Sequence, residues 1–323
     1  MLTRCKEILI AVFLGLVCPA LMITILQNGQ QDIQPTVTNS TVANNEPETL
    51  PLQMSVLMKD GSVKKMTMND YLTCVVLREM PADFETEALK AQAVVARTYA
   101  LRRCVSGGKH TDAAVCTNSD CCQGYYDIKE YLNDTGNSEN IKKVQDAVNM
   151  TNDMVLVYDG ELIDATYFSC SGGRTEDAKA VWGSDIPYLR STQSPGEEKA
   201  AHYVDSVTFS ADAFLERLEI DSSQINNLRI GDITYTAGGG VKTIDICAVT
   251  FKGTEVRNKL GLRSTAFVIS AVGDTVTITT KGFGHRVGMS QYGADAMAVG
   301  GATFPDILAH YYQGTQLVTY LDN

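Results

Sequence analysis

The chain has 323 residues, of which 44% are hydrophobic, and carries a formal net charge of −11. This length is enough for two domains or one large elaborated domain. Because no basic stretch is concentrated enough to follow a phosphate backbone, the composition argues against nucleic acid as a partner.

The N-terminal part of the chain is predicted to be a membrane anchor. Residues 8–26 carry no charge and follow Arg4 and Lys6. The stretch is long enough to cross a bilayer, and the cations place residues 1–7 in the cytoplasm. A cleaved signal peptide and a lipoprotein signal at Cys18 are the alternatives, but no clear cleavage site or suitable lipidation sequence is present. We therefore expect a single-pass anchor with the body outside the cytoplasm.

A polar linker separates this anchor from the folded body. Residues 27–49 consist largely of Gln, Asn, Thr and Ser, a composition typical of a flexible tether. The body is expected to span residues 50–320. It begins with a hairpin around Asp60-Gly61. A short helix then leads to Glu79, and a helix over residues 85–103 follows, with Asp83 in position to cap it.

The rest of the body alternates irregularly between helices and strands. Helices are predicted at residues 137–150, 211–218 and 304–312, and a second hairpin at residues 154–169. Residues 204–280 are mostly strands. The sequence therefore predicts an α+β fold with mixed helices and antiparallel strands in two lobes.

Glu79 is the first candidate for chemistry. It stands between the apolar run of residues 75–77 and the Met80-Pro81 turn. Partial burial there would disfavour the charged carboxylate and raise its pKa, as a general acid working near neutrality requires. Taken alone, this local pattern fits an exposed turn glutamate better, because perturbed carboxylates are a minority.

A His/Cys cluster follows on the next loop. His110, Cys116 and Cys122 are spaced H-x5-C-x5-C, with Cys121 beside the last. One imidazole and two thiolates suit tetrahedral zinc, with a fourth position left for water or a carboxylate. Outside the cytoplasm, disulfides among these cysteines and Cys104 are an equally good interpretation of the spacing.

Two glycine-rich loops hold a second pair of candidates. Cys170 lies in one loop and His285 in the other, so one interpretation is a thiol nucleophile with an imidazole base. A small buried cysteine is the commoner outcome. For His285, four glycines within twelve residues indicate a loop that approaches something closely, which favours a binding or orienting role.

Five segments in order resemble the stage II sporulation protein D family. They are Glu79-Met-Pro81, residues 87–100 (EALKAQAVVARTYA), residues 168–175 (FSCSGGRT), Val181-Trp-Gly183 and residues 282–294 (GFGHRVGMSQYGA). Together they cover nearly all of the predicted body. The blocks around residues 90–93 and 284–293 are specific only in combination.

The resemblance implies a peptidoglycan lytic transglycosylase that acts in sporulation, during engulfment of the forespore. Such enzymes cleave the MurNAc–GlcNAc bond of glycan strands stripped of stem peptides and leave 1,6-anhydroMurNAc ends. The resemblance places Glu79 at the catalytic position. One carboxylate suffices because the sugar's own C6 hydroxyl attacks the anomeric carbon, whereas most glycosidases need two. The expected partners are stage II sporulation proteins P and M, and the expected location is the membrane of the engulfing mother cell.

The family motifs also imply residues for the glycan cleft and the metal. The glycan-binding candidates are Gln92, Arg97, Tyr99, Tyr167, Ser169, Ser171, Thr175, His285, Gln291 and Tyr292. Helical spacing puts Gln92 and Tyr99 on one face and Arg97 on another. Arg286 replaces the usual glycine after His285, so we expect its side chain to narrow the cleft or move the loop. The resemblance to a metal site of clostridial-type members favours zinc at His110, Cys116 and Cys122.

Two other functions remain open on the sequence. The body resembles relatives that stimulate peptidoglycan amidases, so it is a candidate for a non-catalytic, glycan-binding activator. A zinc hydrolase is a further alternative, in which the metal would activate water. Against the hydrolase, two thiolates already give the metal much negative charge.

Overall fold

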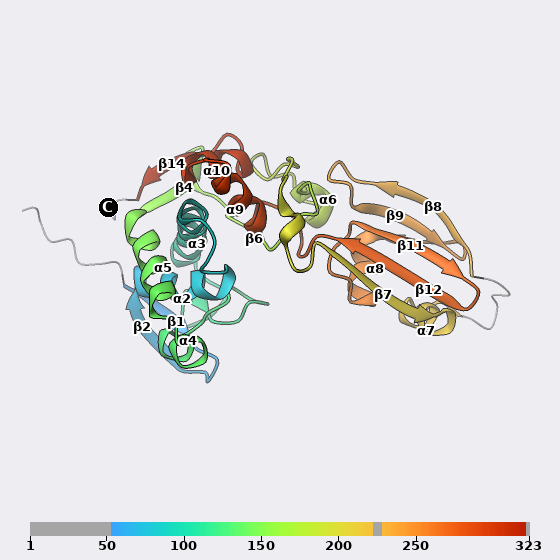
Figure 1. Ribbon diagram of the computed structural model, residues 1–323, viewed down its shortest axis with the longest axis horizontal. Coiled ribbons are helices and arrows are strands. Elements are labelled where there is room, and N and C mark those ends of the chain that lie inside the picture. Colours follow the sequence, from blue (N-terminus) through green and yellow to red (C-terminus); the bar gives the residue numbers. More distant parts are fainter. Residues whose placement is uncertain (1–52, 222–227, 321–323) are drawn as a thin grey trace, which may run out of the picture. The chain divides into compact units, whose positions relative to one another are not determined.

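The computed structural model describes residues 53–221 and 228–320 (Figure 1). These belong to one compact unit, Pro51–Asn323. The predicted cytoplasmic segment, anchor and linker, residues 1–49, lie outside the described residues. Within the described ranges, no helix is both long and apolar enough to span a membrane.

A long helix, α3 (Thr86–Val105), forms the centre of the first hydrophobic core. Ala, Val and Leu side chains surround most of its circumference, as expected for a helix buried on several sides. Several other helices complete this part of the fold, of which all but α4 pack against α3. They are α2 (Met68–Glu79), α4 (Ile128–Thr135), α5 (Ser138–Met150), α9 (Gln291–Val299) and α10 (Phe304–Tyr311).

Three small sheets accompany these helices. The first has the order β2-β1-β3, the second β14-β4-β5, and the third is the parallel pair β13-β6. Their bounds are β1 (Gln53–Leu57), β2 (Val63–Thr67), β3 (Val115–Cys116), β4 (Met154–Tyr158), β5 (Glu161–Leu162), β6 (Tyr167–Phe168), β13 (Met289–Ser290) and β14 (Gln316–Thr319). The β6–β13 pair brings the two glycine-rich loops together.

The strand-rich segment has a second, separate core. Two antiparallel sheets, ordered β11-β12-β7 and β10-β9-β8, enclose Ile244, Val256 and Ile278 together with helices α7 and α8. The bounds are β7 (Val204–Ser210), α7 (Ala211–Arg217), β8 (Ile230–Tyr235), β9 (Val241–Ile246), β10 (Val249–Lys252), α8 (Gly253–Leu260), β11 (Phe267–Val272) and β12 (Thr275–Lys281). Helix α6 (Ala178–Trp182) and the short 3-10 helix η1 (Glu197–Lys199) precede this segment.

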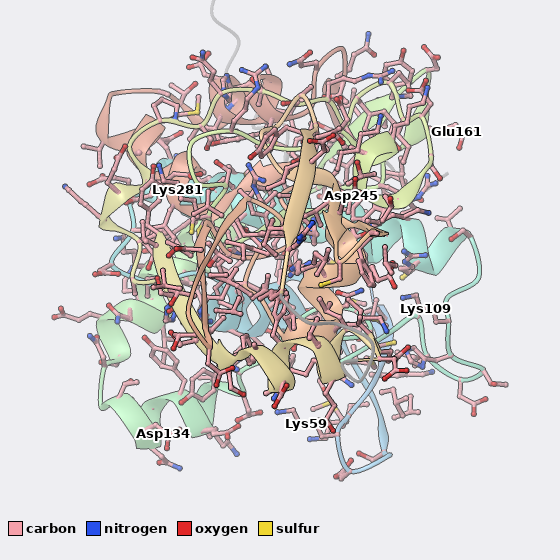
Figure 2. The ribbon with its side chains drawn as sticks, turned by 90° about the vertical axis from the view of Figure 1, so that its right-hand side faces the viewer. Lys59, Lys109, Asp134, Glu161, Asp245 and Lys281 are labelled. Atoms are coloured by element: carbon pink, nitrogen blue, oxygen red, sulfur yellow. The ribbon has the colours of Figure 1, made fainter. Side chains whose placement is uncertain are left out.

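The structure confirms the mixture of helices and antiparallel sheets. The predicted capping of α3 by Asp83 is wrong: Glu85 is the N-cap, and its backbone N–H donates to Asp295 Oδ1 at 2.7 Å. The hairpin around Asp159-Gly160 is shorter than predicted, because β6 leaves it to pair with β13. Charged side chains such as Lys59 and Glu161 project outward at the rim of the body (Figure 2).

Candidate active site

Glu79 is the last residue of α2, which ends because Pro81 cannot continue a helix. Its carboxylate lines a cavity of about 690 Å³. The backbone N–H of Gly124 donates to Glu79 Oε1 at 2.5 Å. One carboxylate oxygen is therefore fixed by a main-chain donor from a distant loop.

The surroundings of Glu79 make it a better acid group near neutrality than a free glutamate. Burial raises the pKa of its carboxyl above the ordinary value of 4.5. The Gly124 N–H, the Tyr167 hydroxyl and Arg78 act in the opposite direction without cancelling this effect. A raised pKa keeps more of the group protonated near neutral pH, which is the state that can donate a proton.

Gly124 has a steric reason to be glycine. A Cβ at this position would lie 2.7 Å from Arg78 Cγ and 2.8 Å from Glu79 Oε1. No real Cβ approaches other heavy atoms so closely, so a larger residue would displace the carboxylate or its loop. Gly124 was not singled out by the sequence, because its contact with α2 joins segments that are 45 residues apart.

Half of the predicted glycan-binding residues line the Glu79 cavity. These are Tyr99, Tyr167, Ser169, His285 and Gln291. Gln92 lies behind them, fully buried, and its Oε1 accepts from Gln291 Nε2 at 3.4 Å. Gln92 is therefore placed to orient Gln291 and does not itself line the cavity.

The other four predicted glycan contacts lie outside the cavity lining. Arg97 is buried and donates to the carbonyls of Val148, Thr151 and Met154. Ser171 and Thr175 are also fully buried and bonded within the protein, and the Tyr292 ring packs on Phe84 at 4.9 Å. The side chains of these four residues hold helices and loops in place.

Glu197 holds the two glycine-rich loops together. Its buried carboxylate accepts from the backbone N–H groups of Ser171, Gly172 and Gly173 and from the hydroxyls of Ser194 and Ser290. Sequence reasoning missed this residue. No local signal marks it, because its donors come from three separate segments of the chain.

Arg286 does not narrow the cleft, which was one of the two effects expected from its size. Its side chain is only 2% exposed, turns away from the cavity and pairs with Glu176 at 3.3 Å. It also donates to the carbonyls of Ser171 and Gly238 at 2.6 and 2.7 Å. The residue has a φ of 66°, which explains why glycine suits the position. Arg286 thereby ties the loop to the β8–β9 turn.

His285 is neutral in this site. Burial, followed by the nearby Arg257 charge, lowers the pKa of its imidazole to about 4. The Val287 N–H donates to His285 Nδ1 at 3.1 Å, so the ring helps to fix the loop. Cys170 is fully buried, and burial raises the pKa of its thiol to about 11. The geometry therefore gives no support to a Cys170–His285 nucleophile pair.

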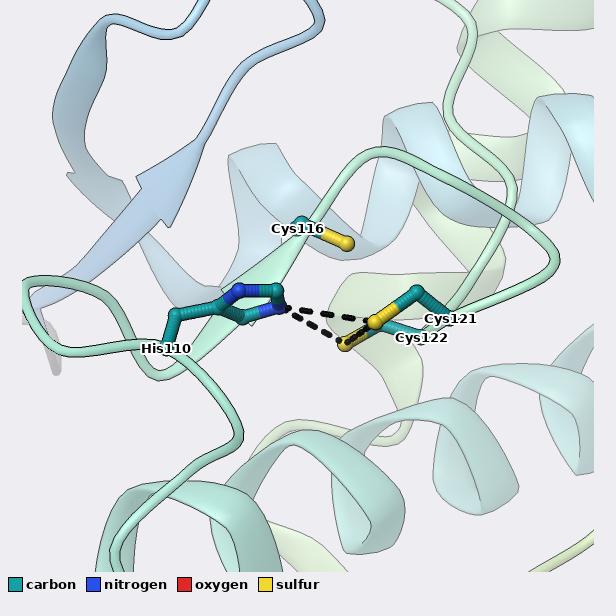
Figure 3. A group of neighbouring side chains, drawn as sticks. All are labelled: His110, Cys116, Cys121 and Cys122. Atoms are coloured by element: carbon teal, nitrogen blue, oxygen red, sulfur yellow. Dashed lines mark hydrogen bonds between the residues drawn. The ribbon is translucent and has the colours of Figure 1, made fainter.

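The His/Cys cluster comes together as four groups, not three (Figure 3). The ligand atoms of His110, Cys116, Cys121 and Cys122 all lie within 4.8 Å of one another. His110 Nε2 is 3.7 Å from Cys121 Sγ and 3.5 Å from Cys122 Sγ, and the two sulfurs are 3.9 Å apart. Tetrahedral zinc would place such ligand pairs about 3.6–3.8 Å apart. The donor set therefore fits zinc, with Cys121 as a fourth ligand.

This cluster anchors the loop that serves Glu79. Cys122 lines the Glu79 cavity, Gln123 donates to the Tyr167 hydroxyl at 3.1 Å, and Gly124 binds the carboxylate. All seven cysteines within the described residues are free thiols, so the cluster contains no disulfide. A rigid cluster therefore also holds Gln123 and Gly124 in place beside Glu79 and Tyr167.

Comparison with known proteins places this fold and site in a family. A family described as "Stage II sporulation protein" matches residues 59–158. The chain is 39% identical to "Stage II sporulation protein D" of Bacillus subtilis (strain 168) over 94% of this chain and 92% of the relative. It is 41% identical to the protein of the same name from Bacillus amyloliquefaciens, over 79% of this chain and 75% of that relative.

The chain therefore belongs to the stage II sporulation protein D family, a family of sporulation proteins. A more distant relative is named "Amidase enhancer", also from Bacillus subtilis (strain 168). It is 29% identical over 76% of this chain and 40% of its own length.

Proposed function

We propose that this protein is a lytic transglycosylase that cleaves the MurNAc–GlcNAc bond of peptidoglycan strands free of stem peptides. The observation that carries the proposal is Glu79: a half-buried carboxylate with a raised pKa, fixed by a main-chain N–H, in a cavity large enough for sugar rings.

In the proposed reaction Glu79 acts twice. It enters protonated and gives its proton to the glycosidic oxygen as the bond to the anomeric carbon of MurNAc breaks. The C6 hydroxyl oxygen of the same sugar then attacks that carbon. Glu79, now a carboxylate, takes the hydroxyl proton, which leaves a 1,6-anhydroMurNAc end and regenerates the acid. No water is consumed, so a second carboxylate to activate water is not required.

Asp120 is the other carboxylate that lines the cavity, and it provides an internal test. It is exposed and lies on the loop between Cys116 and Cys121. A hydrolase would need such a second group as nucleophile or water base. A transglycosylase should retain most of its activity in an Asp120→Asn variant.

Zinc in this proposal has a structural role. His110, Cys116, Cys121 and Cys122 would hold it, and the four protein ligands leave no open position for water. When bound, the metal would stabilise the loop that carries Gln123 and Gly124. This arrangement argues against zinc hydrolysis, because catalytic zinc sites keep one position open.

The cellular setting in this proposal is engulfment of the forespore. The chain would be anchored by residues 8–26 in the engulfing mother-cell membrane and would work with stage II sporulation proteins P and M. Family membership supports this setting, since it makes the chain a sporulation protein.

The second candidate function is activation of a peptidoglycan amidase without cleavage. The name of the relative "Amidase enhancer" favours it. The two candidates separate cleanly, because activation would not depend on the Glu79 carboxylate while transglycosylation would.

The test is a product analysis with the full-length chain and purified glycan strands that lack stem peptides. Products lighter than hydrolytic ones by one water, present for the wild type and for Asp120→Asn but absent for Glu79→Gln, would support the transglycosylase. Products that carry an added water would point to a hydrolase. A folded, zinc-loaded protein that yields no products but still stimulates an amidase would favour the activator.

A further inference from the structure

A second cavity of about 720 Å³ lies outside the Glu79 site, between α6 and the β8–β9 hairpin, which are neighbours in Figure 1. Two aromatic rings, Trp182 and Tyr235, line it. Their side chains are 45% and 55% exposed, and they are the only exposed Phe, Tyr or Trp side chains among the described residues. Exposed rings gathered in one hollow indicate a ligand site.

The charge of this cavity is opposite to that of the chain. Four cations line it, Lys179, Arg190, Lys242 and Lys252, together with one carboxylate, Asp177. Lys179 and Arg190 share Asp185 as an ion-pair partner, at 3.4 and 2.7 Å.

Lys242 and Lys252 are exposed and make no ion pair with another described residue. On a protein with a net charge of −11, this local surplus of cations favours an anionic ligand.

The two cavities meet at one ring contact. The Trp182 ring lies 5.2 Å from the His285 ring, and His285 lines the Glu79 cavity. The β8–β9 turn is fixed to the same loop by the Arg286–Glu176 pair and by the Gly240 N–H, which donates to Glu176 Oε1 at 3.0 Å. A linear polymer in the Glu79 cavity would therefore reach the second cavity across Trp182.

Peptidoglycan without stem peptides has the matching chemistry. Removing the peptide converts the amide on each MurNAc lactyl group into a free carboxylate, so the strand becomes a regular polyanion. Its sugar rings have apolar faces that pack on aromatic side chains. A strand that still carries its peptides lacks these lactyl charges.

We propose that the cavity between α6 and the β8–β9 hairpin is a distal glycan subsite, where Trp182 and Tyr235 pack against sugar rings and Lys242 and Lys252 pair with lactyl carboxylates. The proposal rests on the proposed function for the identity of the glycan. It adds a reason why strands without stem peptides would be preferred.

Trp182 is the only tryptophan of the chain, so its fluorescence reports on ligands bound beside it, and the lysine variants below assign the binding to this cavity. The test uses the full chain carrying Glu79→Gln, which leaves strands uncut. Stripped strands should change the Trp182 emission saturably. The same strands with their carboxylates converted to amides should bind about fivefold more weakly or worse, because two exposed ion pairs are lost.

The variant Lys242→Ala/Lys252→Ala should lose affinity for stripped strands by a similar factor. The matched control, Lys64→Ala/Lys65→Ala, removes two exposed lysines from β2 and should bind as before. Equal affinity for charged and amidated strands, or for the two lysine variants, would overturn the subsite. A wild type that yields no anhydro products would overturn the proposed reaction but leave this binding result standing.

Discussion

Glu79 combines a stability cost with the chemical role proposed for it. Burial raises its pKa, so the folded state holds the proton more tightly than the unfolded state does. The stability that depends on this group is greatest below the unfolded pKa and falls as pH rises through the folded pKa. Near neutral pH the carboxylate therefore opposes folding.

We expect Glu79→Gln to be more stable than the wild type near neutral pH, with a gain that disappears at about pH 4 and below. The variant should also lose cleavage by about 10³-fold, because it removes the acid/base group. Urea unfolding at several pH values measures the change in stability. The rate at which cleaved glycan products form measures the loss of activity. The exposed Glu85→Gln is the control and should change neither. If the Glu79→Gln variant were less stable than the wild type at pH 7, burial of the Glu79 carboxylate would not be destabilising the folded state.

Gly124 should also be sensitive to substitution, although less so than Glu79. A Cβ 2.8 Å from Glu79 Oε1 would push the carboxylate out of place. We expect Gly124→Ala to lower the cleavage rate by about 10²-fold, as small displacements of a catalytic group do. Zinc content should remain normal, which separates this effect from loss of the metal cluster. Gly136→Ala serves as the comparison: nothing lies within 4 Å of its added Cβ, so although its φ of 66° makes the change cost stability, the cleavage rate should stay normal.

At the scale of elements, the His/Cys loop acts as the support of the active carboxylate. We expect the purified chain to hold zinc at an equimolar level and the cobalt-substituted protein to show the absorption of tetrahedral thiolate ligation. Cys121→Ser should weaken metal retention, whereas Cys104→Ser, exposed and outside the cluster, should not. Cobalt should preserve the cleavage rate within about twofold if the metal is structural. A large change in the cleavage rate with cobalt would indicate that the metal takes part in the reaction.

The buried Arg286–Glu176 pair maintains the contact between the glycine-rich loop of residues 282–293 and the β8–β9 turn. Replacing Arg286 with glycine relaxes a backbone φ of 66° but leaves Glu176 with fewer donors. Because an unpaired buried charge outweighs the backbone gain, we expect Arg286→Gly to reduce the free energy of unfolding by about 3 kcal/mol. Thermal or urea unfolding measures this loss. The double variant Arg286→Met/Glu176→Gln should recover part of it, and no recovery would mean that the loss has another origin.

The sequence predicted those elements whose signals are local. The helices predicted at residues 137–150 and 211–218 form as α5 and α7, and the hairpin at Asp60-Gly61 forms. Glu79 was found through a turn signal and a motif. Gly124 and Glu197 were missed because their partners lie far away in sequence. The position of the Arg286 side chain was predicted wrongly for the same reason. The sequence shows the size of this side chain but not that it pairs with the buried Glu176.

At the scale of the whole described body, two hydrophobic cores are linked by polar loops. The first core carries Glu79 and the second carries the hairpin with Tyr235. Glu197 and the Arg286–Glu176 pair join the loops between them. With the proposed distal subsite, a long substrate would have two places to bind, one for the reaction and one for affinity. Short and long substrates should therefore respond differently to the same change.

We expect the cleavage of long stripped strands to become markedly less efficient as salt rises, whereas short fragments that reach only the Glu79 cavity should respond weakly. Salt screens exposed charges such as Lys242 and Lys252 more strongly than the half-buried Glu79 carboxylate. The effect should appear in KM and leave kcat unchanged, because ground-state binding is lost and the reacting groups are untouched. Lys242→Ala/Lys252→Ala should reproduce the high-salt behaviour at low salt. Equal salt sensitivity for short and long strands would mean that the charge dependence arises at the Glu79 cavity itself.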